Sequence, residues 1–141
     1  MSDIYIVAYD GSEGARRAAK FAAERAALAK ASLHLVYVLE WSPYSFLTAE
    51  ELEERHRRRR EELERANQHI LAPMSATLTT AGYTVTSEVR YGNVAKTLVE
   101  VAQEKNARIL YIAKAADGGL MGRVLGSVPG TLIQIAPIPV A

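Results

Sequence analysis

The sequence predicts an α/β fold with a doubly wound, five-stranded parallel sheet and helices on both faces. Short apolar runs alternate four times with longer segments of helical periodicity, and a fifth apolar segment follows. Parallel strands require such crossovers, which are right-handed. The 141 residues, of which 49% are hydrophobic, suit a single domain over residues 1–141.

The first strand and helix lie on either side of a small polar turn. Residues 4–9 form an apolar run rich in β-branched and aromatic side chains, and Asp10-Gly11-Ser12 ends it. This run predicts a buried strand. Alanines recur at helical spacing from Ser12 to about Ala31, so the next segment is expected to be a closely packed helix.

The second strand leads into a long charged helix. Residues 33–39 form another apolar run, and a loop follows it. Thr48 and Glu51 have the spacing of a capping box, which marks the start of a helix. Pro73 lacks an amide hydrogen, so we expect it to bend or interrupt this helix, which resumes and ends at Gly82.

The third strand has the pattern of a sheet edge. Residues 83–90 alternate between apolar and polar, which is typical of a strand with one wet face. A turn at Tyr91-Gly92-Asn93 follows, and Asn93 can cap the third helix, which runs to about Lys105. An edge position for this strand predicts the strand order 3-2-1-4-5.

Two more strands complete the predicted sheet. Residues 108–113 form an apolar strand, followed by a loop of small residues. A fourth helix is expected to begin near Ser127, and the last strand begins at Pro137.

Composition narrows the classes of function. Seventeen Lys and Arg against sixteen Asp and Glu give a net charge of +1, which provides no field for collecting nucleic acid or an anionic membrane. The lack of cysteine excludes disulfides and thiolate chemistry. No apolar run reaches the ~18 residues of a membrane span, and the three histidines show no zinc spacing. We therefore expect no nucleic-acid partner, no membrane partner and no metal site.

A cluster of arginines in the long helix has two interpretations. Residues 57–60 are all arginine and could bind nucleic acid. Glutamates surround them at i,i+3 and i,i+4 distances, however, and this pattern favours a salt-bridged solvent face.

The candidate site lies where the winding of the sheet reverses, between the first and fourth strands. Asp10-Gly11-Ser12 and the glycine-rich loop at 113–127 converge there. Glycines let backbone amides approach an anion, and Gly126-Ser127-Val128 opens a helix whose amino-terminal amides suit a phosphate. Turn formation and helix capping explain the same residues equally well, and Asp10 is either a ligand contact or a helix cap.

Several segments resemble the universal stress protein family. Residues 7–12 are similar to the opening motif of that family, and residues 35–38 to its second strand. Tyr91-Gly92-Asn93 resembles the mid-chain turn of the family, and Gly126-Ser127-Val128 its carboxyl-terminal motif. The resemblance spans essentially the whole chain. It implies a five-stranded parallel fold, a cytoplasmic location, frequent homodimers and, in one branch, bound ATP.

The resemblance also implies roles for individual residues. Asp10 would face the adenine and ribose, and the Val38 backbone would meet the adenine. Gly126, Ser127 and Val128 would hold the phosphates. ATP, with or without Mg²⁺, is therefore the expected cofactor.

Two alanines depart from the pattern of the ATP-binding branch. Ala113 and Ala116 stand where that branch has the two glycines of Gly-x-x-Gly, although the spacing to Gly126-Ser127 is kept. A methyl group at either place would crowd the phosphates or oppose a positive φ, at a cost of roughly 1 kcal/mol if φ is positive.

Three functions follow from these observations. The first is a regulatory module, not an enzyme, that binds an adenine nucleotide at Asp10, Val38 and the loop from Ala113 to Val128. The second is a module without nucleotide that acts through contacts with other proteins, which the two alanines favour. The third is a weak ATP hydrolase, for which the glycine-rich loop offers only Asp117 as a carboxylate candidate.

Overall fold

A parallel sheet forms the centre of the molecule. The computed structural model describes residues 3–40, 49–113, 132 and 134–141. Within them, four strands lie in the order β3-β2-β1-β4. Their bounds are Ile4–Ala8 for β1, Ser32–Glu40 for β2, Val85–Gly92 for β3 and Ile109–Tyr111 for β4. The predicted edge position of the third strand is confirmed.

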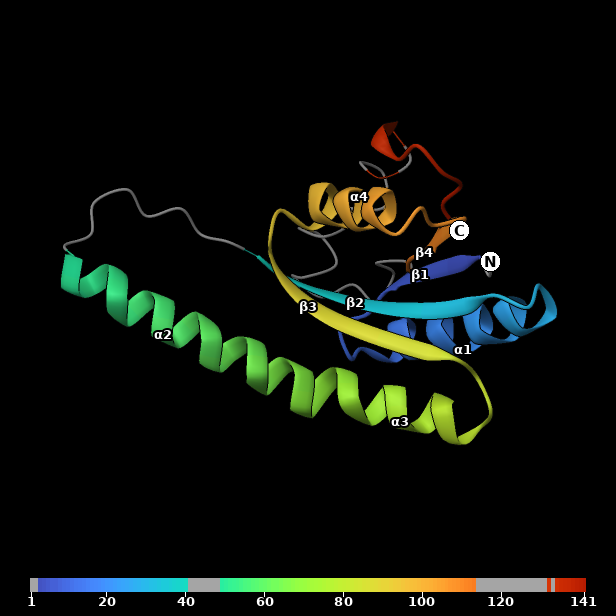
Figure 1. Ribbon diagram of the computed structural model, residues 1–141, viewed down its shortest axis with the longest axis horizontal. Helices are drawn as coiled ribbons and strands as arrows, with labels where there is room; N and C mark the ends of the chain where they lie inside the picture. The colour runs from blue at the N-terminus through green and yellow to red at the C-terminus, as the bar shows by residue number, and fades with distance from the viewer. Residues whose placement is uncertain (1–2, 41–48, 114–131, 133) are drawn as a thin grey trace.

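Helices cover both faces of the sheet, as predicted (Figure 1). One face carries α1 and the nearly continuous helix formed by α2, the π-helical turn η1 and α3, and the other carries α4. The helices span Glu13–Leu28 (α1), Ala49–Ala66 (α2), Asn67–Leu71 (η1), Ala72–Thr80 (α3) and Val94–Glu104 (α4).

The predicted fifth strand is present only as a single bridge. Val140 pairs in parallel with Leu110, on the outer side of β4. The Leu110 amide donates to the Pro139 carbonyl at 3.0 Å, and the Ala141 amide donates to the Leu110 carbonyl at 2.8 Å. Pro137 and Pro139 supply no amide hydrogens, which limits how far this pairing can extend. The described sheet is therefore four-stranded with one bridge, not five-stranded as predicted.

Two boundaries differ from the prediction in an informative way. β3 continues through Gly92, where the sequence predicts a turn, and Asn93 then caps α4 by accepting from the Lys96 amide at 3.1 Å. The long helix is interrupted just before Pro73, by η1, in which the Ala72 amide donates to the Asn67 carbonyl. An i→i−5 bond of this kind is the mark of a π turn.

The sheet separates two hydrophobic cores. Val7, Leu35 and Leu71 are buried on the face of α1 and α3. Ile6 and Leu98 are buried on the face of α4. Because side chains alternate along a strand, β1 and β2 contribute to both cores and are buried on both sides.

Candidate functional site

The winding of the chain reverses between β1 and β4, as predicted. From β1 the chain crosses through α1 to β2 on one side, and β4 pairs with β1 on the other, with Val7 opposite Tyr111. In open parallel sheets, ligands bind at the carboxyl ends of the strands at such a point. Asp10 follows β1 and Ala113 follows β4, so both lie at this edge of the sheet.

The loop after β1 is a well-formed helix entry. Ser12 is the cap of α1, because its Oγ accepts from the Ala15 amide at 3.1 Å. Asp10 is not the cap; its Oδ1 accepts from the Ser12 amide at 2.9 Å. Gly11 lies between them with φ +81°, a conformation that favours glycine. The loop thus holds the exposed Asp10 carboxylate beside the amino terminus of a helix, where anions are favoured.

The backbone of Val38 is placed to meet a ligand at this edge. The Tyr9 amide donates to the Val36 carbonyl at 2.8 Å, the last backbone hydrogen bond between the β1 and β2 segments in the described chain. Alternate residues of a strand point their backbone groups to the same side. The N–H and C=O of Val38 therefore face the side of β1, beyond the last bond, while its side chain packs in the core under α4.

Ala113 carries none of the strain considered from the sequence. Among described residues other than glycine, only Lys30 and Asn106 have a positive φ, so Ala113 does not adopt the left-handed conformation. Its methyl group faces the first turn of α1 and lies 3.4 Å from where a Cβ on Gly14 would stand. That distance is an ordinary van der Waals contact, so the Ala113 methyl group packs closely against the start of α1 without overlap.

Four predicted site residues fall outside the described part of the chain. They are Ala116, Gly126, Ser127 and Val128. The structure therefore brings together Asp10, Val38 and Ala113, and the phosphate-binding role of the loop remains a prediction.

Tyr37, next to Val38 in β2, is a residue near this edge that sequence reasoning did not consider. Burial, together with the nearby charge of Asp10, raises the pKa of Tyr37 above its ordinary value of 10.0. Both effects favour the neutral phenol, which can donate a hydrogen bond, over the phenolate. The signal available in the sequence was its position immediately before Val38, on the opposite face of the same strand.

Ile70 is a second residue at this edge that the sequence did not reveal. Its Cγ2 lies 3.2 Å from the position that a Cβ on Gly11 would occupy. The π turn η1 presents Ile70 there, 59 residues further along the chain than Gly11. No local pattern predicts a contact over this separation.

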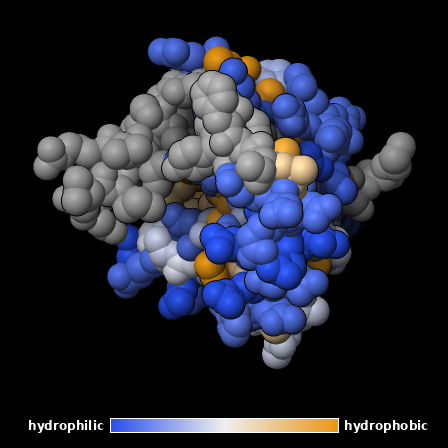
Figure 2. Space-filling view, turned by 90° about the vertical axis from the view of Figure 1, so that its left-hand side faces the viewer, coloured by the Kyte–Doolittle hydropathy of each residue, from blue (hydrophilic) through white to orange (hydrophobic). Residues whose placement is uncertain are grey.

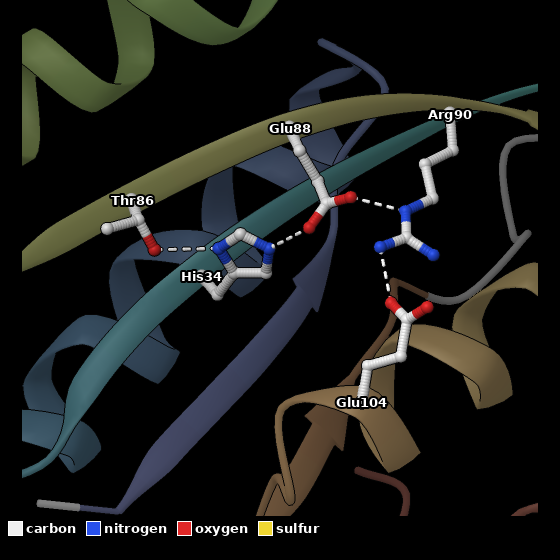
Figure 3. Close-up of polar contacts among 5 residues, drawn as sticks. All are labelled: His34, Thr86, Glu88, Arg90 and Glu104. Atoms are coloured by element: carbon white, nitrogen blue, oxygen red, sulfur yellow. Dashed lines mark hydrogen bonds and ion pairs between the residues drawn. The ribbon is translucent and has the colours of Figure 1, made fainter.

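A polar cluster lies on the α4 side of β2 and β3 (Figure 3). His34 is buried; its Nδ1 is 2.6 Å from the Thr86 hydroxyl and its Nε2 is 2.6 Å from a Glu88 carboxylate oxygen. Arg90 donates to Glu88 and to Glu104, which extends the cluster to α4.

The charge of Glu88 is maintained by its partners in this cluster. Burial alone would raise the pKa of Glu88. The hydrogen bonds from His34 and Arg90, together with the positive charges of these two side chains, have a larger effect and lower the pKa below its ordinary value of 4.5. All the residues of this cluster belong to the sheet or to α4 that covers it, so we assign the cluster a structural role in joining β2, β3 and α4.

The described residues, 3–40, 49–113, 132 and 134–141, contain neither a metal-binding cluster nor a membrane-spanning helix. No group of three or more His, Asp or Glu side chains is arranged to hold a metal ion in these ranges. No helix in them is long and apolar enough to cross a bilayer.

Comparison with known proteins identifies the family. A family model described as the universal stress protein family matches residues 1–141. No curated protein sequence matches the chain. A solved structure from the same family, from Burkholderia pseudomallei, is 26% identical, with a TM-score of 0.65, and the match covers 98% of this chain and 92% of that one.

Two further similar structures contain nucleotides. A universal stress protein solved in complex with cAMP is 24% identical over 99% of this chain and 94% of its own, with a TM-score of 0.69. The universal stress protein from Archaeoglobus fulgidus in complex with dAMP is 20% identical over 99% of this chain and 95% of its own, with a TM-score of 0.61. The match to the family model spans the whole sequence, and the chain belongs to the universal stress protein family.

Proposed function

We propose that this protein is a regulatory module that binds an adenine nucleotide, ATP, at the carboxyl ends of β1 and β4 and does not transform it. The observation that carries the proposal is the reversal of winding between these strands, where the Asp10 loop and Ala113 lie at one edge. The cAMP and dAMP complexes of similar proteins support an adenine nucleotide as the ligand class.

Each described residue has a role suited to its geometry. The exposed Asp10 carboxylate can accept hydrogen bonds from ribose hydroxyls. The N–H and C=O of Val38, beyond the last bond to the β1 segment, can pair with the polar edge of adenine. We assign the phosphates to Gly126, Ser127 and Val128, by the pattern of their sequence. Mg²⁺, where present, would be bound by the phosphates of the nucleotide and not by a cluster of protein carboxylates.

The proposal includes a cellular context and an assembly. We propose a cytoplasmic homodimer, as the family resemblance implies, that acts on a regulatory protein partner. A reaction on the nucleotide is not proposed, because the glycine-rich loop offers only Asp117 as a carboxylate.

Calorimetric titration of ATP, with and without Mg²⁺, tests the proposal. Wild type should bind saturably, and Gly126→Val should abolish binding, because a branched side chain blocks the approach of phosphate to the backbone. Gly119→Val, in the same loop but outside the motif, is the matched control and should keep binding. Absence of binding at millimolar ATP in the wild type would refute the proposal, and steady release of phosphate would refute the absence of turnover.

A module without nucleotide is the second candidate, and the two alanines favour it. Ala113 and Ala116 stand where the ATP-binding branch has glycine. Because Ala113 is unstrained, any interference would come from its methyl group occupying space and not from the backbone. Titration of the double variant Ala113→Gly/Ala116→Gly distinguishes the candidates. Binding gained only in this variant would show that the alanines exclude the nucleotide.

A further inference from the structure

The first part of α2 projects beyond the sheet. In Figure 1, α2 begins far from the strands and approaches them only toward α3. Ala66, its last residue, is the buried residue of this helix. Most helices in proteins are stabilised by packing on other elements, and the first turns of α2 have little such packing among the described residues, so a partner could stabilise them.

One exposed face of α2 carries an ordered stripe of charge. Glu50, Glu53, Arg57 and Arg60 are spaced by three, four and three residues, which places them on one side of the helix. All four are exposed. Arg57 pairs with Glu54 of its own helix, while Glu50, Glu53 and Arg60 form no ion pair with any residue that the structure describes.

The order of charges along this stripe is complementary to itself. We propose that α2 pairs with α2 of a second copy, antiparallel, about a two-fold axis that passes between the two helices at the level of residue 55. Glu50 then faces Arg60 of the other copy, and Glu53 faces Arg57, since each pair of numbers adds to 110. The two-fold axis repeats both pairs, as in any closed dimer contact. An in-register parallel arrangement would place like charges together, so the stripe also selects the orientation.

The stripe suits a second copy better than an anionic partner. Its two glutamates cancel its two arginines, so it offers no net positive field for nucleic acid. Figure 2 looks onto the side from which α2 projects, and its coloured surface is mainly hydrophilic, with small separate hydrophobic areas. The pairing therefore depends on charge and not on apolar burial, and we expect it to be weak and sensitive to salt.

Sedimentation of the full chain tests the pairing. At about 0.02 M salt the weight-average mass should rise with protein concentration, and at about 0.5 M salt this rise should disappear, because salt screens exposed charges. If another surface already forms a dimer, α2 pairing adds larger species with the same salt dependence. A mass that does not respond to salt would overturn the proposal.

Charge-reversed variants provide the decisive measurement. The double variant Glu50→Arg/Glu53→Arg makes all four stripe positions positive, and the double variant Arg57→Glu/Arg60→Glu makes all four negative. Each variant should therefore self-associate at least about tenfold more weakly than wild type. An equimolar mixture of the two should associate again, because every position then faces the opposite charge. Circular dichroism verifies that both variants keep their helices. Failure of the mixture to associate, or wild-type association in either variant alone, would overturn the proposal.

Discussion

Gly92, at the end of β3, is the described glycine at which an added side chain would meet the closest atom. Its φ is +151°, and a Cβ added to it would lie 2.5 Å from the Thr97 hydroxyl oxygen. Gly82 also has a positive φ, +100°, but nothing lies within 4 Å of its added Cβ. The two glycines therefore separate backbone strain from steric overlap.

Replacing each glycine by alanine measures these two effects. Gly82→Ala should lower the free energy of unfolding by about 1 kcal/mol, from strain alone. Gly92→Ala should lower it by about 2–3 kcal/mol, because overlap with Thr97 adds to strain. Urea unfolding of both variants, and of Gly92→Ala with Thr97→Ala as the control that removes the overlap, provides the comparison. Equal losses at the two glycines would contradict this account.

Tyr91 titrates far above a free tyrosine. Burial, and then its hydrogen bond to Glu62 and the charge of that carboxylate, raise its pKa to about 12. The neutral phenol is the form favoured by folding. Its contribution to stability is therefore complete below the ordinary pKa of 10.0 and is lost as the pH rises from there toward about 12.

Ultraviolet titration of the phenolate checks this prediction. Wild type should show a tyrosine that ionises near pH 12, which Tyr91→Phe removes. Glu62→Gln should move that ionisation to lower pH, because the repelling charge is gone. An unchanged titration in Glu62→Gln would contradict the assigned cause.

Among the elements, the edge strand β3 is fastened at both faces. Tyr91 donates to Glu62 of α2 on one side, and Arg90 joins Glu104 of α4 on the other. Edge strands without such cover present unpaired backbone groups to other chains. The polar contacts thus hold in place a strand whose side chains are only partly buried.

Glu88→Gln tests the polar cluster at the scale of the β2–β3 pair. At pH 7 this variant should be less stable by about 2 kcal/mol, because His34 and Arg90 lose a charged acceptor. The folded pKa of Glu88 is depressed, so its contribution is present above pH 4.5 and is lost as the pH falls through the folded value.

The difference in stability between wild type and variant should therefore shrink in acid. Unfolding free energies at pH 7 and below pH 4.5 measure it, and Glu104→Gln is the control. Its more exposed carboxylate should contribute under about 1 kcal/mol at either pH. A difference that grows in acid would refute the assignment.

The whole molecule is built around the two central strands. Residues of β1 and β2, such as Ile6, Val7 and Leu35, are fully buried between the two cores. We expect their amides to exchange most slowly with solvent, those of β3 faster, and those of the first turns of α2 fastest. Hydrogen exchange followed by mass spectrometry, at high salt to suppress pairing of α2, checks this order. Protection of α2 equal to that of β1 would contradict it.

The sequence by itself determined the local features and the order of elements. Asn93 caps α4 as predicted, because its side chain and the Lys96 amide lie three residues apart, whereas the cap of α1 is Ser12 and not Asp10, the cap considered from the sequence. The predicted irregularity near Pro73 is the π turn η1, after which Pro73 stands in the first turn of α3, where its missing amide hydrogen is tolerated. The alternation along the third strand correctly predicted its edge position.

Only the tertiary structure decided which distant residues meet. Periodicity and spacing in the sequence say nothing about contacts between residues far apart in the chain. Three such pairs are Ile70 with Gly11, Tyr37 with the charge of Asp10, and Glu88 with His34. The extent of the fifth strand had both kinds of cause: Pro137 and Pro139 lack amide hydrogens, and β4, its neighbour, is only three residues long, so a single bridge forms at Val140. Local chemistry selects the elements, and packing across the sheet selects their contacts.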